Sequence, residues 1–207
     1  MKDIFIGKKA IGDSHSPFII AELSGNHGGS LDRALELIRS AASVGADAVK
    51  FQTYTPDTIT IKSDREEFLI NDPESLWHGR TLYDLYAEAH TPWEWHQPMF
   101  DCARKLGVEV FSSPFDITAV DFLEDLDTSA YKIASLEITD VQLIEKVAKT
   151  KKPLIMSTGA ASIEDIDNAV KVARENGAKD IILLKCTSSY PALPEDANLN
   201  SMNYMKI

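Results

Sequence analysis

Lysine follows a short apolar run at three places in this sequence. Lys50, Lys132 and Lys185 each end a run of strand-like residues, and Glu22 ends a fourth run. Where strands alternate with helices the sheet is parallel, and ligands bind at the carboxyl ends of its strands. The formal net charge of the chain is -11. Because an acidic protein gathers lysines at these ends, we expect them to bind a small anion.

Hydroxyl groups accompany these lysines. Ser113 follows the third apolar run, and Ser135 comes three residues after Lys132. Ser157 closes a later run and lies two residues before Gly159, which would let backbone N–H groups approach a ligand closely. Cationic and hydroxyl donors of this kind suit phosphate and carboxylate oxygens. The pattern therefore predicts an oxyanion site at the strand ends.

Strand and helix patterns alternate along the chain and predict an α/β fold with a parallel sheet. Strands are expected at 18–23, 48–52, 108–112, 130–133, 153–156 and 181–185. Helices are expected at 30–44, 91–106, 118–126, 139–149 and 162–176, with a shorter one near 82–89 inside a long polar insertion at 54–90.

Two architectures fit this alternation, a (β/α)8 TIM-type barrel and an open doubly wound sheet. No glycine-rich dinucleotide fingerprint follows the first strand, and several strand ends carry polar side chains, which favours the barrel. A closed barrel has eight strands. We therefore expect residues 1–207 to form a truncated N-terminal barrel domain, an incomplete TIM-type barrel with about six βα units.

Two helices begin with apparent capping signals. Thr91 is expected to cap the helix after the insertion, with Glu94 completing a capping box. Thr139 and Gln142 predict the same arrangement for the helix at 139–149.

Composition excludes several classes of protein. The negative charge disfavours nonspecific binding to nucleic acid or to anionic membranes, and no apolar run approaches the roughly 20 residues of a membrane span. Cys102 and Cys186 lie in unrelated segments, which argues against a disulfide framework and favours a cytoplasmic location. No HxxxH or CxxC spacing occurs, so no metal site is expected within this chain.

Five ordered segments carry a resemblance to a known family. They are 21–27 (AELSGNH), 49–53 (VKFQT), 111–116 (FSSPFD), 131–135 (YKIAS) and 156–159 (MSTG). Together they resemble the sialic acid synthase family, whose members condense phosphoenolpyruvate with an acetamido sugar. Segments 52–57, 91–96 and 184–191 look most like the branch that makes pseudaminic acid. Synthesis of N-acetylneuraminate or legionaminate is the alternative within the family, although the neuraminate branch usually has histidine where Lys185 stands.

The resemblance assigns roles to eleven residues. Glu22 would be the acid/base or water-orienting carboxylate. The residues that would hold phosphoenolpyruvate are Lys50, Ser113, Lys132, Ser135 and Ser157. Those that would face the sugar are Gln52, Asn71, Glu137, Ser188 and Tyr190.

The resemblance also implies groups that this chain does not supply. A divalent metal, Mn²⁺ or Mg²⁺, would be held by two histidines on later strands, beyond residue 207. A C-terminal domain resembling an antifreeze protein would supply an arginine to the partner subunit's site, so the full-length protein is expected to be a homodimer.

Two readings from other classes stay open. In a Schiff-base aldolase on a similar barrel, Lys132 or Lys185 would be a nucleophilic amine. The chain would otherwise be an incomplete barrel that binds an anion without turnover.

Overall fold

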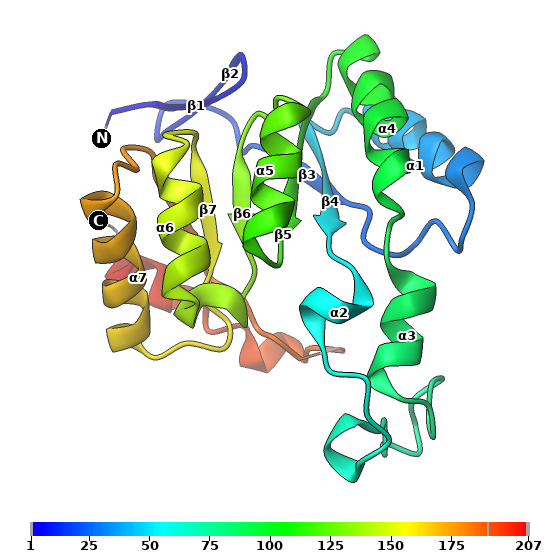
Figure 1. Ribbon diagram of the computed structural model, residues 1–207. Coiled ribbons are helices and arrows are strands. Elements are labelled where there is room, and N and C mark those ends of the chain that lie inside the picture. Colours follow the sequence, from blue (N-terminus) through cyan, green and yellow to red (C-terminus); the bar gives the residue numbers. More distant parts are fainter. Residues whose placement is uncertain (1, 190, 206–207) are drawn as a thin grey trace. The chain divides into compact units, whose positions relative to one another are not determined.

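The chain folds into two compact units. The computed structural model describes residues 2–189 and 191–205 (Figure 1). Unit 1 comprises residues 1–17, 111–113 and 127–207, and unit 2 comprises residues 18–110 and 114–126.

The main sheet has six strands in the order β3-β4-β5-β6-β7-β8, which is also their order along the chain. The pairs β3–β4, β5–β6, β6–β7 and β7–β8 are all parallel. A doubly wound sheet would reverse its strand order at a switch point. The sequential order confirms the predicted TIM-type βα architecture. The strands are β3 (Ile20–Glu22), β4 (Ala48–Thr53), β5 (Glu109–Pro114), β6 (Tyr131–Ile133), β7 (Leu154–Ser157) and β8 (Ile181–Leu184).

Unit 2 is built around β3 and β4. Its helices are α1 (Leu31–Ser43), α2 (Pro56–Ile59), α3 (Leu82–Ala89), α4 (Trp93–Lys105) and α5 (Ile117–Asp125), with a 3-10 turn η1 (Glu66–Phe68). Helices α1 and α4 pack side by side, and α2 packs on α3 (Figure 1). Ile38, Phe51 and Phe100 are fully buried in this unit, and Trp93 stacks on Phe122 with ring centroids 4.6 Å apart. Trp93 therefore packs between α4 and α5.

Unit 1 contains the second half of the sheet. Its helices are α6 (Val141–Lys149) and α7 (Ile163–Glu175), which pack together, and its 3-10 turns are η2 (Glu137–Thr139), η3 (Pro194–Ala197) and η4 (Leu199–Tyr204). A short antiparallel hairpin of β1 (Ile4–Ile6) and β2 (Lys9–Ile11) was not predicted. Gly7 enters its two-residue turn at φ +55°, which is the reason that a glycine stands there. Within the described part of the chain, every helix is too short or too polar to cross a bilayer.

Two predicted helix caps are wrong. Pro92 is the N-cap of α4, and no side chain caps that end, because the Thr91 hydroxyl is turned toward His27. In α6 the Asp140 carboxylate accepts the Leu143 N–H at 3.0 Å, while Thr139 belongs to η2. Ser30 Oγ caps α1 by accepting the Arg33 N–H, and Ser162 Oγ caps α7 by accepting the Asp165 N–H.

Candidate active site

Glu22, the last residue of β3, forms an ion pair with Lys50, which lies in the middle of β4. The two residues are register partners across the parallel pair, and Lys50 Nζ lies 2.5 Å from Glu22 Oε2. The Lys50 side chain is only 8% exposed, whereas that of Glu22 is 45% exposed. Burying an ammonium group is costly unless it is paired. The carboxylate thus stabilises a buried cation while remaining open to solvent.

Ser24 orients the Glu22 carboxylate. Its backbone N–H and its hydroxyl both donate to Glu22 Oε1, at 3.3 and 3.2 Å. Ser24 adopts φ +41°, a left-handed conformation that non-glycine residues seldom take. Such backbone strain persists only where the surrounding structure enforces it. The turn after β3 therefore has one conformation that presents two donors to Glu22.

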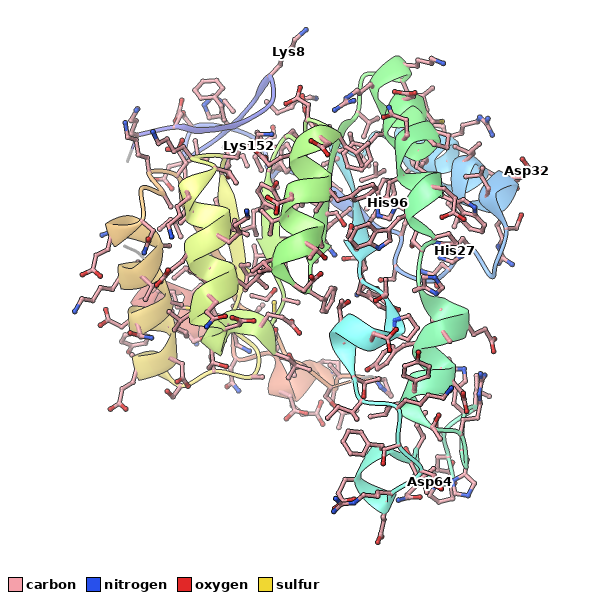
Figure 2. All side chains as sticks on the ribbon, in the orientation of Figure 1. Lys8, His27, Asp32, Asp64, His96 and Lys152 are labelled. Carbon is pink, nitrogen blue, oxygen red and sulfur yellow. The ribbon has the colours of Figure 1, made fainter. Side chains whose placement is uncertain are left out.

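The two faces of β4 have different surroundings. Lys50 and Gln52, two residues apart, share one face, and Gln52 is half-buried. On the other face Phe51 and Thr53 meet His96 of α4, whose Nε2 lies 2.9 Å from Thr53 Oγ1 (Figure 2). Burial lowers the pKa of His96 to about 4, so its imidazole is neutral. His96 therefore belongs to the core that packs against the face of β4 opposite Lys50.

Asn71 lies in the long insertion of unit 2. Its side chain is exposed, and its Nδ2 donates to the Glu66 carbonyl oxygen at 3.4 Å. Its predicted contact with the sugar stays a prediction.

In unit 1, three predicted ligand residues share one face of neighbouring strands. Ser112 pairs with Tyr131 across β5 and β6, so Ser113 and Lys132, one residue further on, point to the same side. Lys132 pairs with Ile155, and Ser157 comes two residues later on that side. We call this side, which bears Ser113, Lys132 and Ser157, the Lys132 face. All three are buried. Lys132 Nζ donates to the Ile133 carbonyl at 3.2 Å.

The turn after β7 is tightly packed around Gly159. Its N–H donates to Ser135 Oγ at 3.2 Å. A Cβ atom at this position would lie 3.1 Å from Ser135 Oγ and would overlap Ser188 Oγ. The thiol of Cys186 donates to Ser157 Oγ at 3.1 Å. Only glycine leaves room beside Ser135 Oγ and Ser188 Oγ, and the ligand roles of Ser135, Ser157 and Ser188 stay predictions.

Glu137 carries an unusual carboxylate. Among the described residues, none forms a hydrogen bond with its buried Oε2 atom. Burial raises the pKa of Glu137, and Asp140 adds to this, while its own backbone N–H and the Lys132 ammonium act in the opposite direction. An acceptor of this kind is satisfied when a donor such as a ligand hydroxyl arrives.

Lys185 does not lie on the Lys132 face, which corrects the expectation that the three lysines are equivalent. Leu184 pairs with Ser157, so the next residue projects to the opposite side of β8. There Lys185 borders a cavity of about 440 Å³, lined by residues of α7, β8 and η4 that include Ile166, Val170 and Leu183. Its Nζ donates to the Cys186 carbonyl at 2.8 Å.

The predicted site residues are thus distributed over both units. Unit 2 holds Glu22, Lys50, Gln52 and Asn71, and unit 1 holds Ser113, Lys132, Ser135, Glu137, Ser157 and Ser188. Tyr190 lies outside the described residues. That Lys50 and Lys132 bind one anion remains a prediction. In the described ranges, no three His, Cys, Asp or Glu side chains gather as they would around a metal ion.

Other contacts were missed from the sequence. His27 forms a hydrogen bond with Thr91, which was assigned to a helix cap. Thr158 Oγ1 donates to the Leu184 carbonyl at 3.0 Å and ties the Gly159 turn to β8. Neither contact has a local signal, since the partners are far apart in the sequence.

Comparison with known proteins gives a consistent result. The family model described as the NeuB family matches residues 37–207. The pseudaminic acid synthase of Campylobacter jejuni is 48% identical over 189 residues, which cover 91% of this chain and 54% of that protein. That of Helicobacter pylori is 48% identical over 186 residues, covering 90% and 54%. The chain therefore spans about half the length of these relatives.

A solved structure agrees with the fold. The crystal structure of an N-acetylneuraminic acid synthetase from Leptospira borgpetersenii, in complex with citrate, matches with a TM-score of 0.85 and 30% identity. The match covers 99% of this chain and 66% of that one.

Proposed function

The chain belongs to the NeuB family. We propose that it forms part of a phosphoenolpyruvate-dependent condensing synthase. The enzyme would join phosphoenolpyruvate to an acetamido hexose, release phosphate and make a nine-carbon sugar acid of the pseudaminic acid type. The 48% identity to two pseudaminic acid synthases supports this choice of product. N-acetylneuraminate or legionaminate synthesis is the alternative, since it uses the same chemistry on another sugar.

The observation that carries the proposal is the Lys132 face beside the Gly159 turn. It offers one buried ammonium group together with the hydroxyls of Ser113 and Ser157 on the same side of the strands. Ser135 and Gly159 add a hydroxyl and a closely packed turn next to it. Charged and hydroxyl donors fixed before the ligand arrives are what a phosphate and a carboxylate require.

In this proposal, phosphoenolpyruvate is bound by Lys50, Ser113, Lys132, Ser135 and Ser157. The sugar is faced by Gln52, Asn71, Glu137, Ser188 and Tyr190. The unpartnered oxygen of Glu137 supports its share of this role, because a sugar hydroxyl would supply the donor that the atom lacks.

The reaction would begin when the methylene carbon of phosphoenolpyruvate attacks the aldehyde carbon of the open-chain sugar. The enol double bond supplies the electron pair of the new C–C bond, and the aldehyde oxygen takes up a proton. Water then adds to the cationic enol carbon, with Glu22 accepting or orienting its proton. The resulting tetrahedral intermediate loses phosphate by C–O cleavage and leaves a keto acid. Lysines and hydroxyls would neutralise the phosphate and carboxylate throughout.

The resemblance to the family also implies a divalent metal, Mn²⁺ or Mg²⁺. The described residues do not gather into a donor set for such an ion. Its histidine ligands are expected beyond residue 207. The homodimer, the antifreeze-like domain with its arginine and the cytoplasmic location are likewise proposals. The two free thiols of Cys102 and Cys186 support the last of these.

Phosphate release is the direct test. The intact protein is incubated with phosphoenolpyruvate, Mn²⁺ and a panel of acetamido hexoses, and inorganic phosphate and keto acid are measured together. Sugar-dependent release of both in equal amounts is expected. Phosphoenolpyruvate binding without any release would favour the anion-binding barrel. Inactivation by borohydride in the presence of a keto acid would favour the Schiff-base aldolase, because the proposed condensation forms no imine.

A further inference from the structure

The turn that follows β3 contacts the residues that join α3 to α4. His27, in this turn, is 2% exposed, and its Nε2 lies 3.3 Å from Thr91 Oγ1, just before α4 (Figure 2). Its ring and that of Trp95 of α4 form a T-shaped pair, with ring centroids 5.4 Å apart and planes at 78°. A buried imidazole with a polar partner on each nitrogen has a fixed orientation.

The hydrogen bonds define which nitrogen of His27 carries the proton. The Gly29 N–H donates to Nδ1 at 3.1 Å, so Nδ1 is the acceptor and Nε2 carries the hydrogen. Nε2 therefore donates to the Thr91 hydroxyl. Burial, helped by the nearby His90 ring, lowers the pKa of His27 and keeps this neutral form. The imidazole thus links a backbone N–H of the turn to a side chain at the start of α4.

A second contact fastens the same turn independently. A Cβ atom on Gly25 would lie 2.9 Å from the carbonyl oxygen of Ala89, the last residue of α3. Only glycine permits this close approach of two backbones. The turn is consequently held at two residues. Gly25 contacts Ala89 at the end of α3, and His27 contacts Thr91 just before α4.

Glu22 depends on the conformation of this turn. Ser24, adjacent to Gly25, supplies both hydrogen bonds to Glu22 Oε1 and does so in a left-handed conformation. Strain of this sort requires support from neighbouring contacts. The Asn26 N–H closes the turn on the Leu23 carbonyl at 3.0 Å, and the Gly25 and His27 contacts hold it against the residues between α3 and α4. A continuous series of contacts therefore leads from α3 and α4 through His27 to the carboxylate.

We propose that His27 is a positioning residue, which through Thr91 and with the Gly25 contact fixes the turn that orients the Glu22 carboxylate. The inference rests on the proposed role of Glu22 and adds to it a residue that does not contact substrate. The same contacts connect the end of the long insertion to this carboxylate. Asn71 lies in that insertion.

The test uses Thr91→Val, which removes the hydroxyl and keeps the shape of the side chain. In the intact protein, hydrogen exchange at the Ser24 and Gly29 amides should quicken about fivefold or more, since loss of one hydrogen bond is worth about 1 kcal/mol. The kcat should fall about tenfold, because small misplacements of reacting groups are costly, while KM for phosphoenolpyruvate stays unchanged. Thr91→Ser should restore both quantities.

The matched control is Thr128→Val in unit 1, where another buried threonine hydroxyl donates to the Ala130 carbonyl at 3.0 Å. It should lower the melting temperature without changing Ser24 exchange or kcat. Unchanged Ser24 exchange in Thr91→Val would overturn the proposal, whatever the activity. So would equal loss of kcat in Thr91→Val and Thr128→Val.

A double-mutant cycle separates this inference from the proposed function. If Thr91 acts through Glu22, Thr91→Val should have little further effect on kcat in a Glu22→Gln background. Full additivity of the two losses would overturn the link. Wild-type turnover of Glu22→Gln alone would instead refute the role of Glu22 in the proposed function, and faster Ser24 exchange in Thr91→Val would still support His27 as the residue that fixes the turn.

Discussion

Glu22 and Lys50 are register partners on adjacent parallel strands, and their charged groups lie 2.5 Å apart. The lysine is buried and the carboxylate is half-exposed, so the fold fixes the cation more firmly than its counter-ion. An anionic ligand that reached Lys50 would compete with Glu22 for the ammonium group. The same ligand would leave the Glu22 carboxylate available for a water molecule or a proton.

Glu22→Gln should separate turnover from binding. We expect kcat to fall by at least about 100-fold, the usual contribution of a general acid or base, while KM for phosphoenolpyruvate does not rise, because the anion no longer competes with a carboxylate for Lys50. Steady-state kinetics of the intact protein measure both. Glu145→Gln, which removes the carboxylate of an exposed ion pair with Lys149 on α6, is the control and should behave as wild type. A similar loss in both variants would contradict the assignment.

Lys132→Ala should weaken binding of the donor substrate. Removing a buried charged partner costs about 2 kcal/mol or more, so KM for phosphoenolpyruvate should rise about 30-fold. Lys152→Ala is the matched control, because Lys152 is also in unit 1 and pairs with exposed Asp127 at 3.4 Å (Figure 2). An unchanged KM in Lys132→Ala would show that this lysine does not bind the anion.

Gly159→Ala should disturb the hydroxyls around the turn after β7. The added methyl group would overlap Ser188 Oγ and press on Ser135 Oγ. We expect KM for phosphoenolpyruvate to rise about tenfold, since roughly 1.4 kcal/mol corresponds to that factor. Isothermal titration with phosphoenolpyruvate checks the affinity directly. Ala160→Ser adds one atom at the next, exposed position and should leave the affinity unaltered.

The sequence predicted the order of the sheet strands and most helix bounds because each element has a clear period and a clear end. Ser30 and Ser162 cap the helices expected at 30–44 and 162–176, and Gly45 and Gly177 follow the helix ends at positive φ. The hairpin of β1 and β2 was missed because three-residue strands are too short to show alternation.

The site was harder to predict where side-chain direction or distant partners decide it. Lys185 follows an apolar run just as Lys132 does, but only the β7–β8 register shows that it points to the other face. The residues around Thr91 have the pattern of a helix cap. Its hydroxyl is instead hydrogen-bonded to His27, which lies 64 residues earlier in the chain. The burial of Glu137 Oε2 likewise follows from packing, not from its neighbours in the chain.

Glu137→Gln should make the protein more stable at neutral pH. Burial raises the pKa of Glu137 in the folded state, so the folded state binds a proton more tightly than the unfolded state does. Its contribution to stability is therefore present at acid pH and is lost as pH rises through the folded pKa. Urea unfolding of the variant should show the gain at pH 7.5 and none at pH 4. Loss of stability at pH 7.5 would contradict this account, and Glu145→Gln should show no pH-dependent difference.

His96 should make the stability fall in acid. Its pKa is about 4 in the folded state against an ordinary value of 6.5, so the unfolded state takes up a proton first as pH drops. The stabilisation is complete above pH 6.5 and is lost between there and about pH 4, and 2.5 pKa units correspond to roughly 3 kcal/mol. Urea unfolding at pH 7.5 and pH 4 should show this decrease in wild type. It should be smaller by that amount in His96→Gln, which keeps a polar partner for Thr53 but does not titrate. His78→Gln, at an exposed histidine, should retain the wild-type dependence. Parallel losses of stability in wild type and His96→Gln would mean that another group controls acid unfolding.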